Sequence, residues 1–367
     1  MGSVFSEAKF IWCKGYENTV NCYVDFFETL SVKDGCEYRL YITADSNYSL
    51  YINDKYVEGG QFADYPDQCK IYDDLDITAH LKAGENSLKV IGYCQNEDSS
   101  TYRKGIPGVM YTVTENGKAV LNSSLDTKVC LDPNYVSGVV DKVSGQLSYS
   151  FECDLSAKGE AFGEAVETRV FDNLAPRPIK KLILKEKPQI KHLSSGSFSD
   201  GECSDTMGKR VQHTYLGFGN RYLAPDLVKG LKLETNEGKD GVYCVFDIGR
   251  EEAGFITFDV EAAEDTEIYL GWGEHLEDMR IRTYVGGRNF AARVKIPAGR
   301  TEFMHTFKRC GGRYVSLHAY GKGVTVNYIG IRPTDYPTTA NISFKCADGM
   351  HREIYETCKR TLLLCMH

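Results

Sequence analysis

Three side chains close to one another in the sequence have the types and spacing that proton-transfer chemistry requires. Tyr314, His318 and Tyr320 occupy even-numbered positions of a predicted strand whose odd-numbered positions are apolar, so all three share one face. With Arg313 beside them, this face could neutralise a uronate and move protons, as a β-sandwich polysaccharide lyase must do. The alternative, which we favour, is that these side chains cover a seam between this domain and a neighbouring one.

A second candidate group contains two carboxylates, Glu274 and Asp278, with His275 between them. A pair of carboxyl groups can act as general acid and general base. Here the pair follows the end of a predicted strand, in a segment that carries charges of both signs. We therefore interpret this segment as a solvated loop or as a contact surface for a neighbouring domain.

Sugar binding is the third kind of chemistry that the sequence permits. Trp12, Tyr16, Tyr102 and Arg103 lie outside the clear strand patterns and could form an edge on which a pyranose ring stacks. Trp12 could equally close the end of a β-sandwich. The chain contains 24 Tyr and 17 Phe, an excess that suits sugar-binding faces, but half-buried strands explain the excess more simply.

The residues that could bind a metal ion are a group of aspartates and the cysteines. The aspartates are Asp64, Asp67, Asp73, Asp74 and Asp76, and their oxygens could hold a structural Ca²⁺, although their spacing fits no dedicated calcium loop. The 13 cysteines include no Cys-x-x-Cys pair and no zinc-type cluster, so we interpret them as reduced, buried thiols. We predict no metal site and no cofactor.

Charge and hydropathy exclude two classes of partner. The formal net charge is −8 and no basic block occurs, so we expect no nucleic-acid partner. No segment approaches the ~20 consecutive apolar residues of a membrane span, so we expect no membrane partner. The N-terminal residues lack the apolar region of a signal peptide. The sequence as given indicates a cytoplasmic protein, or a periplasmic one whose signal was removed.

The elements that must position these residues are mostly strands. Two series of short segments alternate apolar and polar residues; the first ends near Cys153 and the second begins near Val242. A Pro- and Lys-rich strap and a polar region around Ser194–Gly208, which we interpret as a mobile loop, lie between the two series. We predict an all-β fold with two β-sandwich (jelly-roll-like) domains, at residues 1–170 and 191–337, and a linker strap at residues 171–190.

A short helix is predicted in the last part of the sequence, residues 338–367. Ile354, Cys358, Leu362 and Cys365 recur at three- and four-residue spacing and give this helix an apolar stripe. The sequence offers no Gly, Asn or Pro to end it. We therefore expect the chain to be the front part of a longer protein, and we expect the exposed stripe to drive self-association into a homo-oligomer.

Two segments of the first domain carry a resemblance to a known fold. Tyr48–Lys55 is a predicted strand that runs into an Asx-type turn. In Asp76–Asn86, Asp76 can cap one helical turn, Leu81 can pack that turn down, and Gly84 permits a tight turn. This pair of segments resembles the galactose-binding-like jelly roll found beside the catalytic domains of many glycoside hydrolases.

The second domain carries a more specific resemblance. Asp247–Phe255, Gly271–Asp278 and Arg309–Val315 closely resemble the β-sandwich of bacterial α-L-rhamnosidases, glycoside hydrolase family 78. In that family the order is jelly roll, Pro-Arg-Pro strap, β-sandwich and then an (α/α)6 catalytic barrel. The resemblance implies that Ala175–Pro178 is the strap and that Ile342–His367 is the first helix of the barrel.

The resemblance also implies that this chain lacks the catalytic residues. In the family, acidic residues in the barrel carry out inverting hydrolysis of terminal α-L-rhamnosides, and none of them matches a position of this sequence. We therefore predict no catalytic residue here, but an accessory region that binds a rhamnose-containing glycan or serves as a scaffold for a missing barrel in cis. Two alternatives stay open: a free-standing carbohydrate-binding protein and the polysaccharide lyase.

Overall fold

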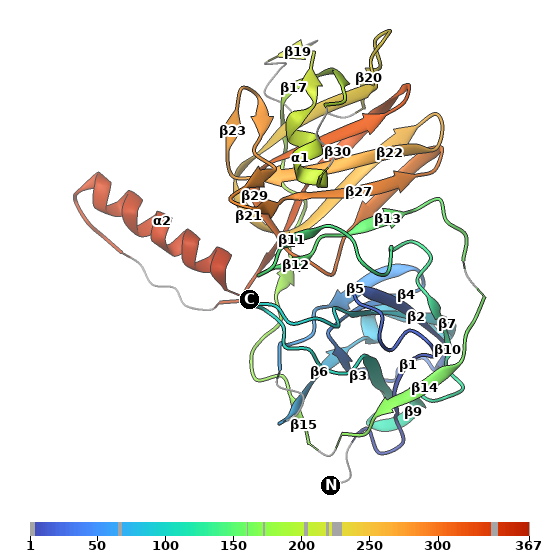
Figure 1. Cartoon of the computed structure of the whole chain (residues 1–367). Coiled ribbons are helices and arrows are strands. Elements are labelled where there is room, and N and C mark those ends of the chain that lie inside the picture. The colour runs from blue at the N-terminus through green and yellow to red at the C-terminus, as the bar shows by residue number, and fades with distance from the viewer. Residues whose placement is uncertain are drawn as a thin grey trace. The chain divides into compact units, whose positions relative to one another are not determined.

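The computed structural model describes residues 4–64, 68–159, 161–171, 173–201, 205–217, 220–221, 230–338 and 344–366. Strands make up 53% and helices 8% of the structure, which confirms the all-β prediction of two sandwich domains with a short C-terminal helix. Two compact units are present (Figure 1): unit 1 comprises residues 1–178, 287–289 and 293–295, and unit 2 the rest. The contacts thus divide the chain between Pro178 and Ile179, whereas the sequence interpretation treats residues 171–190 as a linker.

Unit 1 is built from two sheets and a few short elements. The seven-stranded sheet has the order β14 (Ala165–Arg169), β1 (Phe10–Cys13), β8 (Gly108–Glu115), β3 (Tyr38–Asp45), β6 (Lys70–Asp76) and β15 (Leu174–Pro176), with β9 (Lys118–Asn122) beside β8. The five-stranded sheet has the order β10 (Lys128–Leu131), β2 (Cys22–Val32), β7 (Gly84–Cys94), β4 (Asn47–Ile52) and β5 (Lys55–Gly59). The short elements are η1 (Thr78–His80), β11 (Lys142–Ser144), β12 (Ser148–Tyr149) and β13 (Glu152–Asp154).

The core of unit 1 follows from the alternation of its strands. Cys22, Val24 and Phe26 are buried on one face of β2, as their spacing predicts. The same parity fails at Leu147, whose side chain is 39% exposed, because this residue lies in the turn between β11 and β12. Alternation therefore predicts burial only where a segment is long enough to be a strand.

The turn after β6 has the local structure that its sequence predicts. The Asp76 carboxylate accepts a hydrogen bond from the Thr78 amide at 3.0 Å, at the start of η1. Leu81 packs against the core of unit 1. Gly84 has a φ of +92°, which a residue with a side chain rarely adopts, and it leads directly into β7.

The Pro-Arg-Pro segment is fastened to unit 1 by its arginine. Leu174–Pro176 forms β15 and pairs in parallel with β6. Arg177 then binds the buried Asp73 with two nitrogens, Nε to Oδ1 at 2.5 Å and Nη2 to Oδ2 at 3.2 Å. Arg177 also donates to the Gly60 carbonyl oxygen, and the Tyr48 hydroxyl donates to Asp73. We refer to Arg177, Asp73 and Tyr48 as the strap anchor.

Unit 2 contains one large sheet that folds over on itself. Its strands include β27 (Ala291–Ile296), β22 (Thr266–Gly273), β29 (Cys310–Tyr320), β21 (Gly241–Ala262), β17 (Lys191–Ser199), β18 (Tyr215–Leu216), β19 (Asn220–Arg221), β28 (Gly299–Met304), β30 (Gly323–Asp335), β20 (Leu231–Glu234) and β16 (Ile183–Leu184). The long strand β21 pairs with β17 and β29 in its first half and with β28 and β30 in its second half. One strand therefore belongs to both layers.

Two hairpins and one short helix accompany this sheet. The hairpins are β23 (Leu276–Glu277) with β24 (Arg280–Ile281), and β25 (Tyr284–Val285) with β26 (Arg288–Asn289). Helix α1 is Met207–His213, and the Thr206 hydroxyl caps it by accepting from the Lys209 amide. The interpretation of Ser194–Gly208 as one polar loop is therefore wrong, since its first part belongs to β17 and its last part to α1; residues 202–204 lie outside the described residues.

Helix α2 (Gly349–Cys365) leaves its apolar side chains uncovered. The Asp348 carboxylate caps the helix by accepting from the Met350 amide at 2.8 Å. The side chains of Ile354 and Leu362 are 53% and 63% exposed. Arg360 ties the later turns to unit 2 by donating to the Glu251 carbonyl oxygen at 3.0 Å and to the Glu252 carboxylate.

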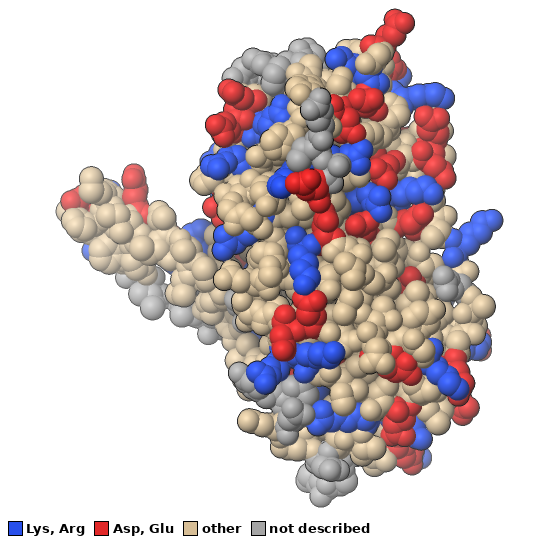
Figure 2. Space-filling model, in the orientation of Figure 1, with Lys and Arg blue, Asp and Glu red and all other residues tan. Residues whose placement is uncertain are grey.

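The surface carries charged side chains of both signs, as the composition predicts. Figure 2 shows positive and negative side chains interspersed over the visible face. Among the described residues, no helix is long and apolar enough to cross a membrane.

Candidate functional site

Of the residues predicted to share one face of β29, His318 and Tyr320 lie against helix α1 or the residue that follows it. The Asp200 carboxylate accepts from Arg210 of α1 at 2.6 Å and from the Tyr320 hydroxyl at 2.8 Å. The Arg210 guanidinium also lies over the rings of Tyr269 and Tyr320, at 5.2 and 5.1 Å from their centroids. We refer to Asp200, Arg210, Tyr269, His318 and Tyr320 as the α1 cluster. Its charges are paired with one another.

His318 is held neutral inside this cluster. Its side chain is only 4% exposed, and its Nε2 lies 3.3 Å from the Thr214 hydroxyl. The ring contacts Phe198 at 5.2 Å and Tyr243 at 5.8 Å between centroids. Burial, together with the charge of Arg280, lowers the pKa of His318 to about 3. The imidazole is therefore uncharged at neutral pH and out of reach of a polymer in solvent.

The remaining members of the predicted lyase-like face are also engaged. Burial and the bond to Asp200 raise the pKa of Tyr320 above its ordinary value, so the phenol keeps its proton. Tyr314 is half-buried, with the Arg313 guanidinium 5.3 Å from its ring centroid. Arg313 pairs with Asp247 at 2.8 Å, so this guanidinium already has a carboxylate partner. The geometry supports packing under α1 rather than β-elimination.

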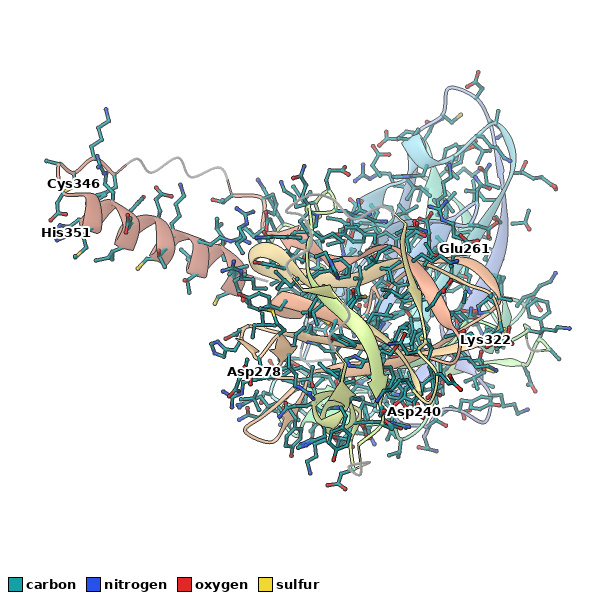
Figure 3. The ribbon with its side chains drawn as sticks, turned by 90° about the horizontal axis from the view of Figure 1, so that it is seen from above. Asp240, Glu261, Asp278, Lys322, Cys346 and His351 are labelled. Atoms are coloured by element: carbon teal, nitrogen blue, oxygen red, sulfur yellow. The ribbon has the colours of Figure 1, made fainter. Side chains whose placement is uncertain are left out.

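Glu274 lies on the surface, as a solvated loop requires. Its side chain is exposed, and so are those of His275 and Asp278. The charge of Glu274 nevertheless acts on a neighbouring carboxyl group. Burial, followed by the charges of Glu274 and Glu252, raises the pKa of Glu251 to about 7. Figure 3 places Asp278 on a different side of unit 2 from Lys322. The exposure of Glu274 and Asp278 fits a solvated loop better than an acid and base that enclose a substrate.

A groove of about 790 Å³ lies on unit 2. Its lining includes Lys232, Glu234, Lys239, Asp240, Glu261 and Lys322, three of which Figure 3 labels. Lys232 pairs with Glu234 at 2.7 Å, and Lys322 pairs with Glu264 at 3.1 Å. Among the described residues that line the groove, none carries an aromatic ring on which a sugar could stack.

Trp12 is a core residue and cannot form a surface stacking edge. Its side chain is fully buried in unit 1, 5.9 Å from the Phe26 ring between centroids. A Cβ on Gly92 would lie 2.9 Å from the indole, so the strand opposite is shaped around the ring. Trp12 therefore closes the sandwich and does not form a sugar-binding edge, because an indole ring without solvent-exposed surface cannot contact a ligand.

The other predicted sugar-binding residues, Tyr16, Tyr102 and Arg103, lie in loops of unit 1. The Tyr102 hydroxyl donates to Asp45 and accepts from the Gly105 amide at 2.9 Å, which fastens its loop. Burial and the Asp45 charge raise the pKa of Tyr102 above its ordinary value. Arg103 is exposed, and Tyr16 is half-buried against the core of unit 1. The loops of Tyr16 and Tyr102 are joined through Asn96, which donates to the carbonyl oxygens of residues 17 and 19.

The described aspartates of the candidate calcium group form ion pairs or hydrogen bonds with other residues of unit 1. Asp73 belongs to the strap anchor, Asp74 pairs with Arg39 at 2.8 Å, and Asp76 accepts from the Thr78 amide at 3.0 Å. Asp64 accepts from the Ile71 amide and pairs with Lys70 at 3.3 Å, while Asp67 lies outside the described residues. No group of three His, Cys, Asp or Glu side chains in the described part of the chain is arranged to hold a metal ion.

The sequence analysis did not identify one buried group of charged side chains in unit 1. Lys70 is almost fully buried between Asp64, at 3.3 Å, and Asp45, at 3.8 Å. Burial raises the pKa of Asp45 to about 6, although the Lys70 charge opposes the shift. The three residues come from separate segments of the chain, so no local spacing could reveal them.

The comparisons with known proteins agree with these sandwich units. Residues 237–331 match the family described as bacterial alpha-L-rhamnosidase concanavalin-like domain. No curated protein sequence matches the chain.

Three solved structures share the fold. A family 78 rhamnosidase of Bacillus sp. GL1 has a TM-score of 0.82 at 16% identity, covering 98% of this chain and 58% of its own. The α-L-rhamnosidase from Dictyoglumus thermophilum has a TM-score of 0.63 at 15% identity, covering 98% and 39%. The enzyme from Aspergillus terreus has a TM-score of 0.61 at 15% identity, covering 96% and 39%.

The chain therefore spans at most 58% of the length of these enzymes. Its residues 237–331 are similar to the concanavalin-like domain of bacterial α-L-rhamnosidases, and its fold is shared with solved α-L-rhamnosidases, among them an enzyme of glycoside hydrolase family 78.

Proposed function

We propose that this chain is the accessory region of an α-L-rhamnosidase-like glycoside hydrolase and acts as a scaffold for a catalytic (α/α)6 barrel. The parent reaction would be the inverting hydrolysis of terminal α-L-rhamnosides. Such a reaction needs a carboxylic acid and a carboxylate about 6.5–9.5 Å apart on either side of a bound sugar. The acidic side chains of the α1 cluster and the strap anchor are instead paired with arginines inside the units.

The observation that carries the scaffold role is the α1 cluster itself. Asp200, Arg210 and Tyr320 join α1 to the polar face of β29 through paired charges and ring contacts. A sugar-binding face needs exposed rings and free hydrogen-bonding groups. This face instead uses its rings and charges to hold the fold together.

Titration calorimetry with sugars tests this role directly. We expect no saturable heat with L-rhamnose, a rhamnose-capped oligosaccharide or galactose, because Trp12 is buried and Tyr102 is bonded to Asp45. We also expect no hydrolysis of an aryl α-L-rhamnoside by the chain alone. Saturable binding that prefers rhamnose would instead make the units a recognition module, and hydrolysis would place catalytic groups in this chain.

Helix α2 gives the second test of the scaffold role. In the proposed enzyme, other helices of the barrel would cover the exposed Ile354 and Leu362. In the isolated chain we expect a second copy to cover them, because exposed apolar surface favours association. Sedimentation velocity should show a more monomeric species when residues 338–367 are deleted.

A full-length variant separates the apolar stripe from the rest of the deleted segment. Ile354→Glu combined with Leu362→Glu leaves Arg360 in place and should reduce association as much as the deletion does. An oligomer that persists unchanged in both variants would show that association uses another surface.

A further inference from the structure

The outer face of the five-stranded sheet in unit 1 is covered by residues 132–138, which we call the covering segment. The Asp132 amide donates to the Tyr23 carbonyl oxygen at 3.0 Å, and the Tyr23 amide donates to the Ser137 hydroxyl at 3.0 Å. The Asn21 side chain donates to the carbonyl oxygens of residues 136 and 138. The Tyr135 ring stacks on Tyr23 with 4.4 Å between centroids. The segment thus hides an aromatic surface of β2.

Two carboxyl groups and one ammonium group are enclosed under this segment. The side chains of Asp25 and Asp132 are each 1% exposed. Lys89 Nζ lies 2.7 Å from Asp25 Oδ2 and 3.6 Å from Asp132 Oδ2. Asp132 Oδ1 accepts from the amides of Asn134 and Tyr135, both at 2.8 Å. If both acids were ionised, the enclosed group would carry an uncompensated negative charge.

Two buried oxygens of this group have no donor. Asp25 Oδ1 and Asp132 Oδ2 have no hydrogen-bond partner among the described residues. The two carboxyl groups are close enough to hydrogen-bond each other if one of them carries a proton. A single proton would remove the excess charge and satisfy both oxygens at once, whereas two ionised carboxylates would repel each other at low dielectric.

We propose that Asp25 and Asp132 share one proton at neutral pH, and that this proton holds the covering segment on the sheet. When the proton leaves, the repulsion between the carboxylates acts on Asp132, whose side chain anchors the first turn of the segment. The segment then loosens and uncovers Tyr23, whose ring also lies 4.7 Å from that of Tyr93. The arrangement is a pH-sensitive cover over an aromatic surface.

The other groups that face the pair stay in one charge state. Burial lowers the pKa of Lys89, but the two carboxylates outweigh burial and raise it, so the ammonium group remains charged. Burial raises the pKa of Cys130 to about 12, and it raises those of Tyr23, Tyr135 and Cys153 well above their ordinary values. Tyr51 faces Lys89 from β4. The proton that changes with pH is therefore the one on Asp25.

The direction of the pH effect follows from the raised pKa. Burial, then the charge of Asp132, raises the pKa of Asp25 well above the ordinary carboxyl value of about 4, against the opposing charge of Lys89. The folded state therefore binds this proton more strongly than the unfolded chain does. Its contribution to stability is complete below about pH 4 and is lost as the pH rises through the folded-state pKa of Asp25.

Amide hydrogen exchange of the full chain tests the cover, with Asp25→Asn as the informative variant. The asparagine amide can donate to Asp132 Oδ2 at every pH while its oxygen still accepts from Lys89. At pH 8.5 we expect amides of residues 134–137 to exchange at least about tenfold faster in the parent chain than in the variant. At pH 5.5 the two should exchange alike. Comparing both proteins at one pH removes the intrinsic pH dependence of exchange.

The control is Asp34→Asn, which neutralises an exposed aspartate of the same unit and should behave as the parent chain does. Infrared spectroscopy supplies a second readout that does not depend on opening. The protonated-carboxyl band at pH 7 should lose intensity in Asp25→Asn, while the part of the band that Glu251 and Asp45 contribute should remain. An exchange ratio that does not change with pH, or a band whose intensity is the same in the parent chain and in Asp25→Asn, would overturn the proposal.

Discussion

Replacing Arg177 with alanine is expected to destabilise unit 1 by about 3–5 kcal/mol, the usual cost of breaking a buried ion pair by removing one partner. The substitution leaves the buried Asp73 carboxylate without the guanidinium, while the Tyr48 hydroxyl still donates to it. It also removes the bond to the Gly60 carbonyl oxygen. Urea denaturation followed by tyrosine fluorescence measures the loss.

Two further variants define the origin of this effect. Arg103→Ala removes an exposed arginine and should change stability by no more than about 0.5 kcal/mol. Arg177→Lys keeps the charge but not the two-nitrogen geometry, so it should fall between the parent chain and the alanine variant. A loss below about 1 kcal/mol for Arg177→Ala would mean that Asp73 finds another partner or takes up a proton.

Replacing Trp12 with alanine is expected to cost about 3–5 kcal/mol, because a fully buried aromatic side chain leaves a cavity when it is removed. The Phe26 ring and the backbone at Gly92 lie against the indole, and β1 is paired on both sides, so the site can collapse only partly. The same denaturation experiment gives the magnitude.

Trp12→Phe is the matched variant, since it keeps an aromatic ring in the same place and should lose less. Sugar titration of both variants separates structure from binding. A Trp12→Ala protein with unchanged stability and altered sugar binding would reverse the assignment of Trp12 to the core. Equal losses for alanine and phenylalanine would show that the indole shape, rather than the buried area, determines the cost.

The strands that the sequence predicts best are those with one buried face. Tyr38, Leu40 and Ile42 are buried in β3, as expected, and the residues between them, Arg39 and Tyr41, are only half-buried. Strand β17 was missed because its environment removes the alternation. Ser194 and Ser195 point to opposite faces and are both fully buried, so small polar residues take the place of an apolar pattern.

Sequence spacing does not reveal the role of a residue whose decisive partner is distant in sequence. His318 and Tyr320 were found by their spacing on one strand, but spacing cannot show that Arg210 of α1 occupies the space above them. The Pro-Arg-Pro segment was likewise recognised as a strap, while its function as an anchor depends on Asp73, 104 residues earlier. Local patterns predict elements, and long-range ion pairs become visible only in the fold.

The strap anchor has a consequence for how the protein is made. Asp73 leaves the ribosome 104 residues before Arg177, and β1 must likewise wait for β14, which ends at Arg169. At about 5–20 residues per second, translation of that interval takes about 5–20 s. During that time Asp73 of a nascent unit 1 lacks its guanidinium partner and the sheet has an open edge, so chaperones and proteases have access to the unit until the Pro-Arg-Pro segment emerges and completes it.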